Sequence, residues 1–268
     1  MRSAFSVLLL CFLLASCSER KRLQKKAEAG DAEAQVTLGW MYYAGEDYAG
    51  KEVPKDYVES AKWYRRAAEQ GNAEAQSALG ELYFRGIGVQ RDFSKALKWT
   101  RMGAEQGDAF GQYYFGKMYK EGKGVPKDMA QAAKWYRKAA EQGWSDAQYS
   151  LCFMYAKGNG VPQDYAEAAK WVRKAAEQGH VPAKSNLGEL YFHGIGVQRD
   201  FSKALKWTRM GAEQGDAFGQ YYFGKMYEEG KGVPKDMAQA SKWFRKAAEQ
   251  GNANAKEWLR QNAKENGE

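Results

Sequence analysis

Apolar and small residues recur along this chain at helical spacing, in segments that glycines interrupt at a constant interval. Each interval of 36 residues reads as a small-rich helix (helix A), a glycine loop and a second helix centred on tryptophan (helix B). A fixed period of this length is typical of repeat architectures, in which neighbouring units bury a shared core. The string Glu-Gln-Gly marks the period with Gly71, Gly107, Gly143, Gly179, Gly215 and Gly251.

The helix ends are marked by capping residues, as one unit illustrates. Asn72 is a good N-cap for a helix over 73–84, and Gly86 supplies a left-handed stop. Asp92 can cap a second helix over 93–106. The pattern therefore predicts an all-α fold in which six helix pairs are followed by a lone C-terminal capping helix.

A tryptophan stands at the same place in every predicted helix B, four residues before an alanine or glycine. We expect each large ring to pack against this small neighbour and so to hold the stack together. The tryptophans are Trp63, Trp99, Trp135, Trp171, Trp207 and Trp243. The small residues are Ala67, Gly103, Ala139, Ala175, Gly211 and Ala247.

The unit motif carries a family resemblance. It reads Ala-x-x-Leu-Gly-x-x-Tyr-x-x-Gly, then Gly-Val-Pro-Lys-Asp, then Ala-x-x-Trp-x-x-x-Ala-Ala-x-x-Gly. This pattern resembles the Sel-1-like repeat family, whose members are related to tetratricopeptide repeats. The resemblance implies a right-handed α/α solenoid that acts as a protein-interaction scaffold.

The period and its ends divide the chain into the following expected segments. They are a signal peptide (1–16), a lipidated cysteine with a basic tether (17–30), repeats at 31–71, 72–107, 108–143, 144–179, 180–215 and 216–251, and a capping helix with its tail (252–268).

Half of the repeat array is a copy of the other half. Residues 187–251 match residues 79–143 at 61 of 65 positions, and the exceptions are His193, Glu228, Ser241 and Phe244. A recent copy keeps almost every residue whatever its role, so this identity does not reveal which residues function. It predicts two nearly equivalent surfaces.

The N-terminus reads as an export signal. Arg2 is followed by an apolar run over 4–15, which is shorter than the roughly 20 residues that span a bilayer. Leu14-Ala15-Ser16-Cys17 resembles the lipobox of bacterial lipoproteins, which implies acylation of Cys17, and Ser18 resembles lipoproteins sorted to the outer membrane. The alternative is an ordinary secretory signal cleaved nearby.

One side of helix A carries aromatic residues where solvent exposure is expected. Ser77, Glu81 and Phe84 point away from the side of Leu79 on a helical wheel. If the fold resembles tetratricopeptide proteins, this side forms the concave surface and would bind a protein or peptide partner. The alternative is that the rings pack against neighbouring A helices. The predicted groove comprises Trp40, Tyr43, Phe84, Phe110, Tyr113, Lys117, Tyr149, Phe153, Phe192, Phe218, Tyr221 and Lys225, with Glu81 and Glu189 between them.

Composition supports a folded protein with a positive surface. The 268 residues are 44% hydrophobic and 28% charged, with a formal net charge of +8. Basic residues crowd helix B, either as a solvated outer face or as a surface that attracts anionic lipid or polysaccharide. Nucleic acid is not an expected partner outside the cytoplasm. The basic stripe comprises Lys134, Arg137, Lys138, Lys170, Arg173 and Lys174.

Residues that could carry catalysis are scarce. The two histidines, His180 and His193, have no partner at the spacing of a metal site or a catalytic triad. Once Cys11 leaves with the signal and Cys17 is acylated, Cys152 stands alone at a position that other units give to glycine, and a packed thiol is expected there. We expect no catalytic residue, no metal and no cofactor.

Two function classes remain open. The first is a non-catalytic protein-interaction scaffold, lipid-anchored in the bacterial envelope and acting in envelope assembly, signalling or host contact. The second is a module that binds polysaccharide or peptidoglycan, because aromatic rings beside polar groups also stack on sugars.

Overall fold

The chain folds entirely into helices over the residues that the structure describes. This computed structural model describes residues 20–47, 50 and 52–265, and their only extended pairing is an isolated bridge between Glu46 and Glu52. A helical segment over 20–28 comes first. The A helices are α2 (Ala32–Ala44), α4 (Ala73–Arg85), α6 (Ala109–Glu121), α8 (Ser145–Lys157), α10 (Val181–His193) and α12 (Ala217–Glu229). The B helices are α3 (Tyr57–Glu69), α5 (Phe93–Glu105), α7 (Met129–Glu141), α9 (Tyr165–Glu177), α11 (Phe201–Glu213) and α13 (Met237–Glu249), and α14 (Ala253–Glu265) ends the array.

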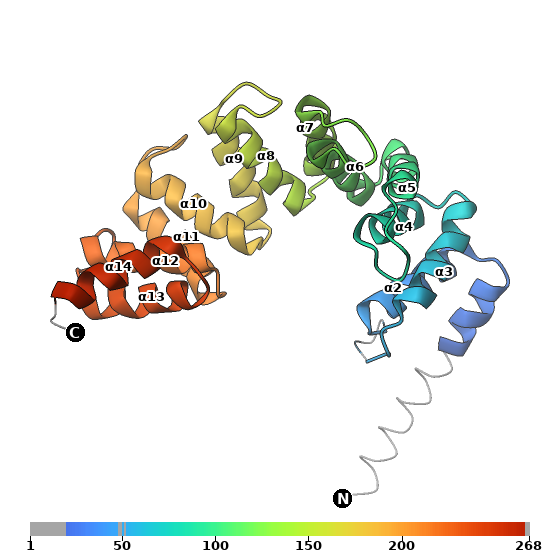
Figure 1. Ribbon diagram of the computed structural model, residues 1–268, viewed down its shortest axis with the longest axis horizontal. Coiled ribbons are helices and arrows are strands. Elements are labelled where there is room, and N and C mark those ends of the chain that lie inside the picture. The colour runs from blue at the N-terminus through green and yellow to red at the C-terminus, as the bar shows by residue number, and fades with distance from the viewer. Residues whose placement is uncertain (1–19, 48–49, 51, 266–268) are drawn as a thin grey trace, which may run out of the picture. The chain divides into compact units, whose positions relative to one another are not determined.

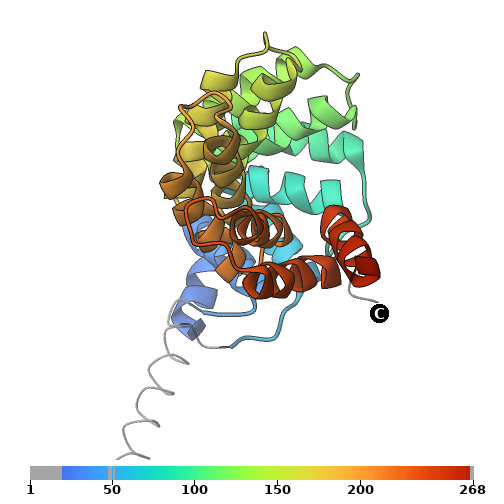
Figure 2. The same ribbon diagram turned by 90° about the vertical axis from the view of Figure 1, so that its left-hand side faces the viewer.

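These helices stack as antiparallel hairpins in two compact units, Met1–Trp135 and Tyr136–Glu268. In the first unit, α2 pairs with α3 and α4 with α5, each B helix contacts the next A helix, and α4 also contacts α6 (Figure 1). The second unit repeats this arrangement through α8 to α13, and α14 packs on α13 (Figure 2). This confirms the predicted all-α repeat fold with its C-terminal helix.

The predicted helix ends are confirmed in detail. Asn72 accepts a hydrogen bond from the N–H of Ala75 at 2.9 Å, and Gly86 ends α4 with a φ of 74°. Gly88, two residues on, is required by close packing. It has a φ of +65°, and a Cβ there would overlap the carbonyl oxygen of Tyr57 at the start of the preceding B helix. Gly124, Gly196 and Gly232 approach Phe93, Tyr165 and Phe201 in the same way, so these glycine loops pack against the repeat before them.

Buried glutamines connect successive helices at one end of each hairpin. Gln76 donates to the carbonyl of Ala68 at 3.1 Å and accepts from Gln106 at 2.6 Å. The glutamine of the Glu-Gln-Gly string thus completes the hydrogen bonding of a buried amide in its own repeat. The same side-chain pair recurs as Gln35–Gln70, Gln148–Gln178 and Gln220–Gln250. In α10 the buried position is taken by Lys184, which donates to Gln214 at 3.0 Å.

At the two repeats in which tryptophan is followed by glycine, the predicted packing is not found. An added Cβ at Gly103, four residues after Trp99, would overlap the hydroxyl of Ser77. The space beside this small residue is therefore filled by the facing A helix, and the expected ring-against-glycine contact is wrong there and at Gly211, which faces Ser185.

Trp63 and Trp171 are buried and the other four tryptophans of the B helices are half-buried, and basic side chains lie over several of these rings. Arg66 lies 4.6 Å from the ring centre of Trp63, and Lys246 lies 4.4 Å from that of Trp243. The residue that follows each of these tryptophans is buried, as with Phe244, which fits beside Gly224. Cation–π contacts from long aliphatic stems of this kind also cover Trp99, Trp171 and Trp207.

The last helix closes the array. The rings of Trp258 in α14 and Phe244 in α13 have centres 4.3 Å apart, and the indole N–H of Trp258 donates to Glu228. Arg260, at the position that complete repeats give to glycine, is exposed. Glu228 and Phe244 are two of the four positions at which the copied blocks differ, so the second copy is altered where it meets the cap.

The signal peptide, Cys17 and the first part of the tether lie outside the described residues. Across the described part of the chain, none of the helices has the length and apolarity needed to cross a membrane.

Candidate functional site

The A helices of each unit share a surface, here called the A-helix face, on which aromatic and charged side chains are linked. In the first unit, the Tyr114 hydroxyl donates to Glu81 at 2.8 Å, and Arg85 donates to the same carboxylate at 2.8 Å. Arg85 also donates to the Tyr43 hydroxyl at 3.2 Å. This network joins α2, α4 and α6. Burial, followed by the charge of Glu81, raises the pKa of Tyr114.

The second unit builds the same link with one change. The Tyr222 hydroxyl donates to Glu189 at 2.7 Å, and burial followed by that hydrogen bond raises the pKa of Tyr222. His193 stands where the first unit has Arg85, and its Nε2 lies 3.3 Å from the same hydroxyl. Each carboxylate of the A-helix face is therefore held by a tyrosine from the next A helix.

The predicted groove residues divide into exposed and packed groups. Trp40 and Phe153 are 37% and 40% exposed, whereas Phe84 and Phe192 are buried. The remaining predicted groove residues are half-buried: Tyr43, Phe110, Tyr113, Lys117, Tyr149, Phe218, Tyr221 and Lys225.

The expectation of solvent exposure is wrong for Phe84 and Phe192. Phe84 packs edge-on against Tyr114 at 5.8 Å, and Phe192 meets Tyr222 at 5.9 Å. It is also wrong for Ser77 and Glu81, which are buried. The cause is the next A helix, which covers these positions and which a single-helix wheel omits.

Lysines lie over several rings of this face. Lys117 has its ammonium 5.3 Å from the ring centre of Phe84, and Lys225 lies 5.8 Å from that of Phe192. These lysines were placed in the groove by their register, and the structure brings them against the rings. The aromatic faces of this surface thus already hold cations.

A pocket of about 440 Å³ opens on the A-helix face of the second unit, between α8, α10 and α12. It contains three of the predicted groove residues, Tyr149, Phe153 and Phe218. Glu189, which the sequence had placed between the groove residues, also lines it, and the lining residues that sequence reasoning missed are Pro182, Asn186 and Asp216. The signal for Asp216 was available, because it is the N-cap that the repeat places before each A helix.

Cys152 of α8 belongs to the buried core of the second unit. Burial, followed by the charge of Glu189, raises the pKa of the Cys152 thiol to about 12. A thiol with so high a pKa is almost entirely protonated at neutral pH and is a poor nucleophile. Cys152 is free and buried, as the packed-thiol interpretation requires.

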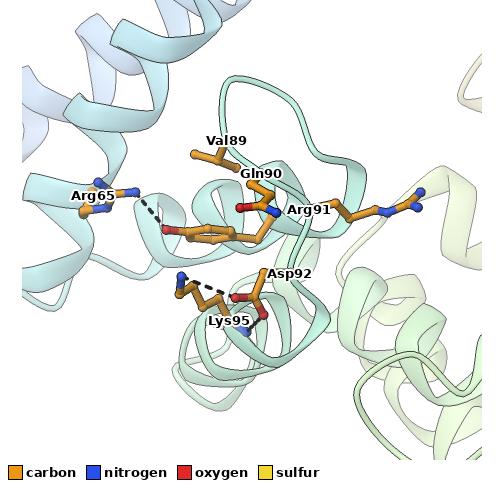
Figure 3. A pocket seen from close by; sticks show the side chains of 7 residues that line it. Arg65, Val89, Gln90, Arg91, Asp92 and Lys95 are labelled. Atoms are coloured by element: carbon orange, nitrogen blue, oxygen red, sulfur yellow. Dashed lines mark hydrogen bonds and ion pairs between the residues drawn. The ribbon is translucent and has the colours of Figure 1, made fainter.

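The B-helix side of each unit carries a different, basic pocket. In the first unit, Arg65 of α3 donates to the Tyr83 hydroxyl at 2.8 Å, and Lys95 lies 3.3 Å from Asp92 (Figure 3). Arg91 extends away from these groups (Figure 3). The pocket measures about 350 Å³, and its counterpart in the second unit, lined by Arg173, Tyr191, Asp200 and Lys203 among others, measures about 370 Å³.

In each basic pocket one arginine already donates to a tyrosine hydroxyl and one lysine already pairs with an aspartate. The six residues of the predicted basic stripe are exposed, as both interpretations of that stripe require.

The two histidines serve structural contacts. His180 accepts from the N–H of Ala183 at 3.2 Å, which makes it the N-cap of α10, and its ring lies 4.6 Å from that of Tyr149. Across the described residues, no group of three or more His, Cys, Asp or Glu side chains is placed to hold a metal ion.

This arrangement of capped helix pairs, whose A helices share one surface within each unit, defines the chain as an α/α repeat protein. The family model named Sel1 repeat matches it six times, at residues 32–72, 73–108, 109–144, 145–180, 181–216 and 217–252. The chain therefore belongs to the Sel1 repeat family, whose members are generally non-catalytic protein-interaction scaffolds.

Two solved structures share both fold and sequence with this chain. A Sel1 repeat protein from Oxalobacter formigenes is 38% identical with a TM-score of 0.73, over 90% of this chain and 68% of that one. A protective antigen of uropathogenic Escherichia coli with an SLR fold is 35% identical with a TM-score of 0.71 over 90% of this chain. This chain spans 58% of the length of that antigen. No curated protein matches.

Proposed function

We propose that this protein is a non-catalytic scaffold of the bacterial cell envelope that binds a partner protein on its A-helix face. The observation that carries the proposal is the row of rings and carboxylates on the A helices of each unit. Exposed Trp40 and Phe153 occupy the same position of α2 and α8, one in each unit, and Phe153 lines a pocket together with Glu189 of the following A helix. An exposed ring on the A helices of each unit suits an extended peptide or a partner helix.

The proposal is tested by removing the two exposed rings. The double variant Trp40→Ser and Phe153→Ser, made in the full chain, should retain the partner at least about tenfold less well, because large rings carry much of the free energy of protein binding. The matched control is Val58→Ser with Tyr165→Ser, which removes two exposed apolar side chains from the B helices α3 and α9. Both variants should keep the helical circular dichroism spectrum of the wild type.

Equal partner retention by the two double variants would contradict the A-helix face as the docking site. The immobilised protein should also be tested for binding of peptidoglycan and of acidic polysaccharide, since exposed rings beside carboxylates also stack on sugars. Sugar that is retained through Trp40 and Phe153, with no protein partner, would favour the polysaccharide-binding alternative.

The envelope anchor is proposed on the lipobox resemblance of residues 14–17, with the outer membrane as the destination. A fatty acid attached at Cys17 gives membrane binding of about 0.8 kcal/mol for each buried methylene, and several chains make it stable. Metabolic labelling with an alkyne fatty acid should mark the wild type and Cys152→Ala but not Cys17→Ala. Labelling of Cys17→Ala would contradict the lipid anchor at Cys17. It would not bear on the proposal that a partner docks on the A-helix face.

A further inference from the structure

The pocket between α8, α10 and α12 is lined by aromatic rings and by acids. Tyr149 and Phe153 meet edge to face with ring centres 4.9 Å apart, and Phe218 completes the aromatic lining. Glu189 and Asp216 supply two carboxylates, and no lysine or arginine is among the lining residues. Phe153 is 40% exposed, so the aromatic wall begins at the surface.

Both carboxylates are fixed in position and retain capacity to accept hydrogen bonds. Asp216 accepts from the N–H of Gly219 at 2.7 Å, and Glu189 accepts from the Tyr222 hydroxyl at 2.7 Å. An ionised carboxylate offers about four lone-pair sites, so one such bond leaves most of them for a ligand. The charges of Asp216 and Glu189 act in the same direction on the hydroxyl of Tyr149, whose pKa is raised by burial first and then by these charges.

The chemistry that fits this lining is a cation on a flexible apolar stem. The faces of aromatic rings attract an ammonium or guanidinium group, and the carboxylates add charge-assisted hydrogen bonds. The neighbouring contact of Lys225 with Phe192 shows the same pairing within the chain. A pocket of about 440 Å³ has room for such a side chain.

We propose that this pocket receives a lysine or arginine side chain of the partner segment that docks on the A-helix face. The inference rests on the proposed function and adds the chemistry of the residue that the partner must present. The first unit supports it, because the equivalent positions hold Trp40, Glu81, Asp108 and Phe110, which again combine rings with carboxylates. Glu74 adds a third acid there, and burial followed by the charge of Asp108 raises its pKa.

The test removes both charges of the pocket and keeps its hydrogen bonds. In Asp216→Asn the cap should survive, because Asn72 and Asn252 cap α4 and α14 in the same register. In Glu189→Gln the amide oxygen can still accept from Tyr222. The matched control is Asp164→Asn with Glu167→Gln, which makes the same two changes at the start of the B helix α9.

The probe is the blocked peptide acetyl-Gly-Lys-Gly-amide, compared with the same peptide acetylated on the lysine side chain. In NMR spectra of the full chain with isotope-labelled aromatic rings, the charged peptide should shift the ring resonances of Tyr149, Phe153 and Phe218. Its affinity should fall roughly tenfold in the double charge variant and stay unchanged in the control, because removing two nearby charges is worth about that much. The acetylated peptide should produce no comparable shift.

Equal shifts from the charged and acetylated peptides, or equal affinity in the charge variant, would overturn the cation pocket. Shifts that Ca²⁺ alone produces and the peptide does not would also overturn it, in favour of a metal site. Partner retention separates this inference from the proposed function. If the charge variant retains the partner fully while Trp40→Ser with Phe153→Ser loses it, the A-helix face stands and the cation pocket fails.

Discussion

The indole N–H of Trp258 in the last helix donates a hydrogen bond to Glu228, a residue that replaces Lys120 of the first copied block. A lysine at this position offers no acceptor, so it cannot hold the tryptophan. The replacement is therefore specific to the repeat that meets the cap. It shows how a duplicated block was adapted where the array ends.

Returning this position to lysine should loosen the cap. Glu228→Lys should make the backbone amides of α14 exchange with solvent about tenfold faster, because a partly buried hydrogen bond to a charged group is lost. Hydrogen exchange followed by mass spectrometry measures this directly. The reverse change in the first copy, Lys120→Glu, is the control and should leave α14 unchanged. An unaltered exchange rate in Glu228→Lys would show that the ring contact with Phe244 alone holds the helix.

Lys184 offers a stabilising substitution. It is 5% exposed and takes the place of the buried glutamine that bridges the hairpins at four other repeats. In Lys184→Gln the amide can accept from Gln214 and donate to the end of α9, as Gln148 donates to Ala140. We expect a gain of about 1 kcal/mol in the free energy of unfolding, because a lysine amine with three donors is poorly matched in a buried site. Urea denaturation tests this, and Gln148→Lys should lose stability in turn.

Buried tyrosines should make the fold sensitive to alkaline pH. The pKa values of Tyr114 and Tyr222 are raised in the folded protein, while the unfolded chain releases these protons near pH 10. The stability that they contribute is therefore fully present below about pH 10 and is lost as the pH rises further. Urea midpoints between pH 8 and pH 11 should fall steeply in the wild type and less steeply in Tyr114→Phe with Tyr222→Phe. Parallel curves would contradict this origin of the pH dependence.

Cys152 should be unreactive until the protein unfolds. Its side chain is buried between α8 and its neighbours, and its raised pKa leaves little thiolate at neutral pH. A chromogenic disulfide reagent at pH 7.5 should therefore label a protein in which Cys11 and Cys17 are both replaced by alanine at the rate of global or local opening. In urea the Cys152 thiol should react at once. Rapid labelling of the folded protein would show that Cys152 is open to solvent.

Local features of the sequence were sufficient to predict the helix pairs, because they depend on short-range chemistry. Asn72, Gly86 and Asp92 act on residues within one helical turn. Capping residues recur with the period of the repeats, which supports the same helix boundaries along the chain. The packing of Phe84 could not be predicted in the same way. It depends on Tyr114, which is 30 residues away and reaches α4 only after α5 has reversed the chain.

The tryptophan packing failed for a related physical reason. A contact between residues four apart in one helix is visible in the sequence, but the space beside Gly103 is filled by Ser77 from the facing helix. The groove was predicted from aromatic and charged residues within the A helices, so it omitted Pro182, which is neither, and Asp216, which precedes α12 as its N-cap. The pocket lies beside the middle of α8 and of α10 and the start of α12.

The most direct test of the account is photo-crosslinking from one residue on each side of a repeat. Phe153 on α8 and Tyr165 on α9 are both exposed aromatic residues, but they lie on different helices of the hairpin. Each is replaced in turn by a photoreactive phenylalanine. In intact cells that express the full chain, the account predicts a protein adduct from position 153 and none of that mass from position 165. The same adduct from both positions, or from position 165 only, would contradict docking on the A-helix face.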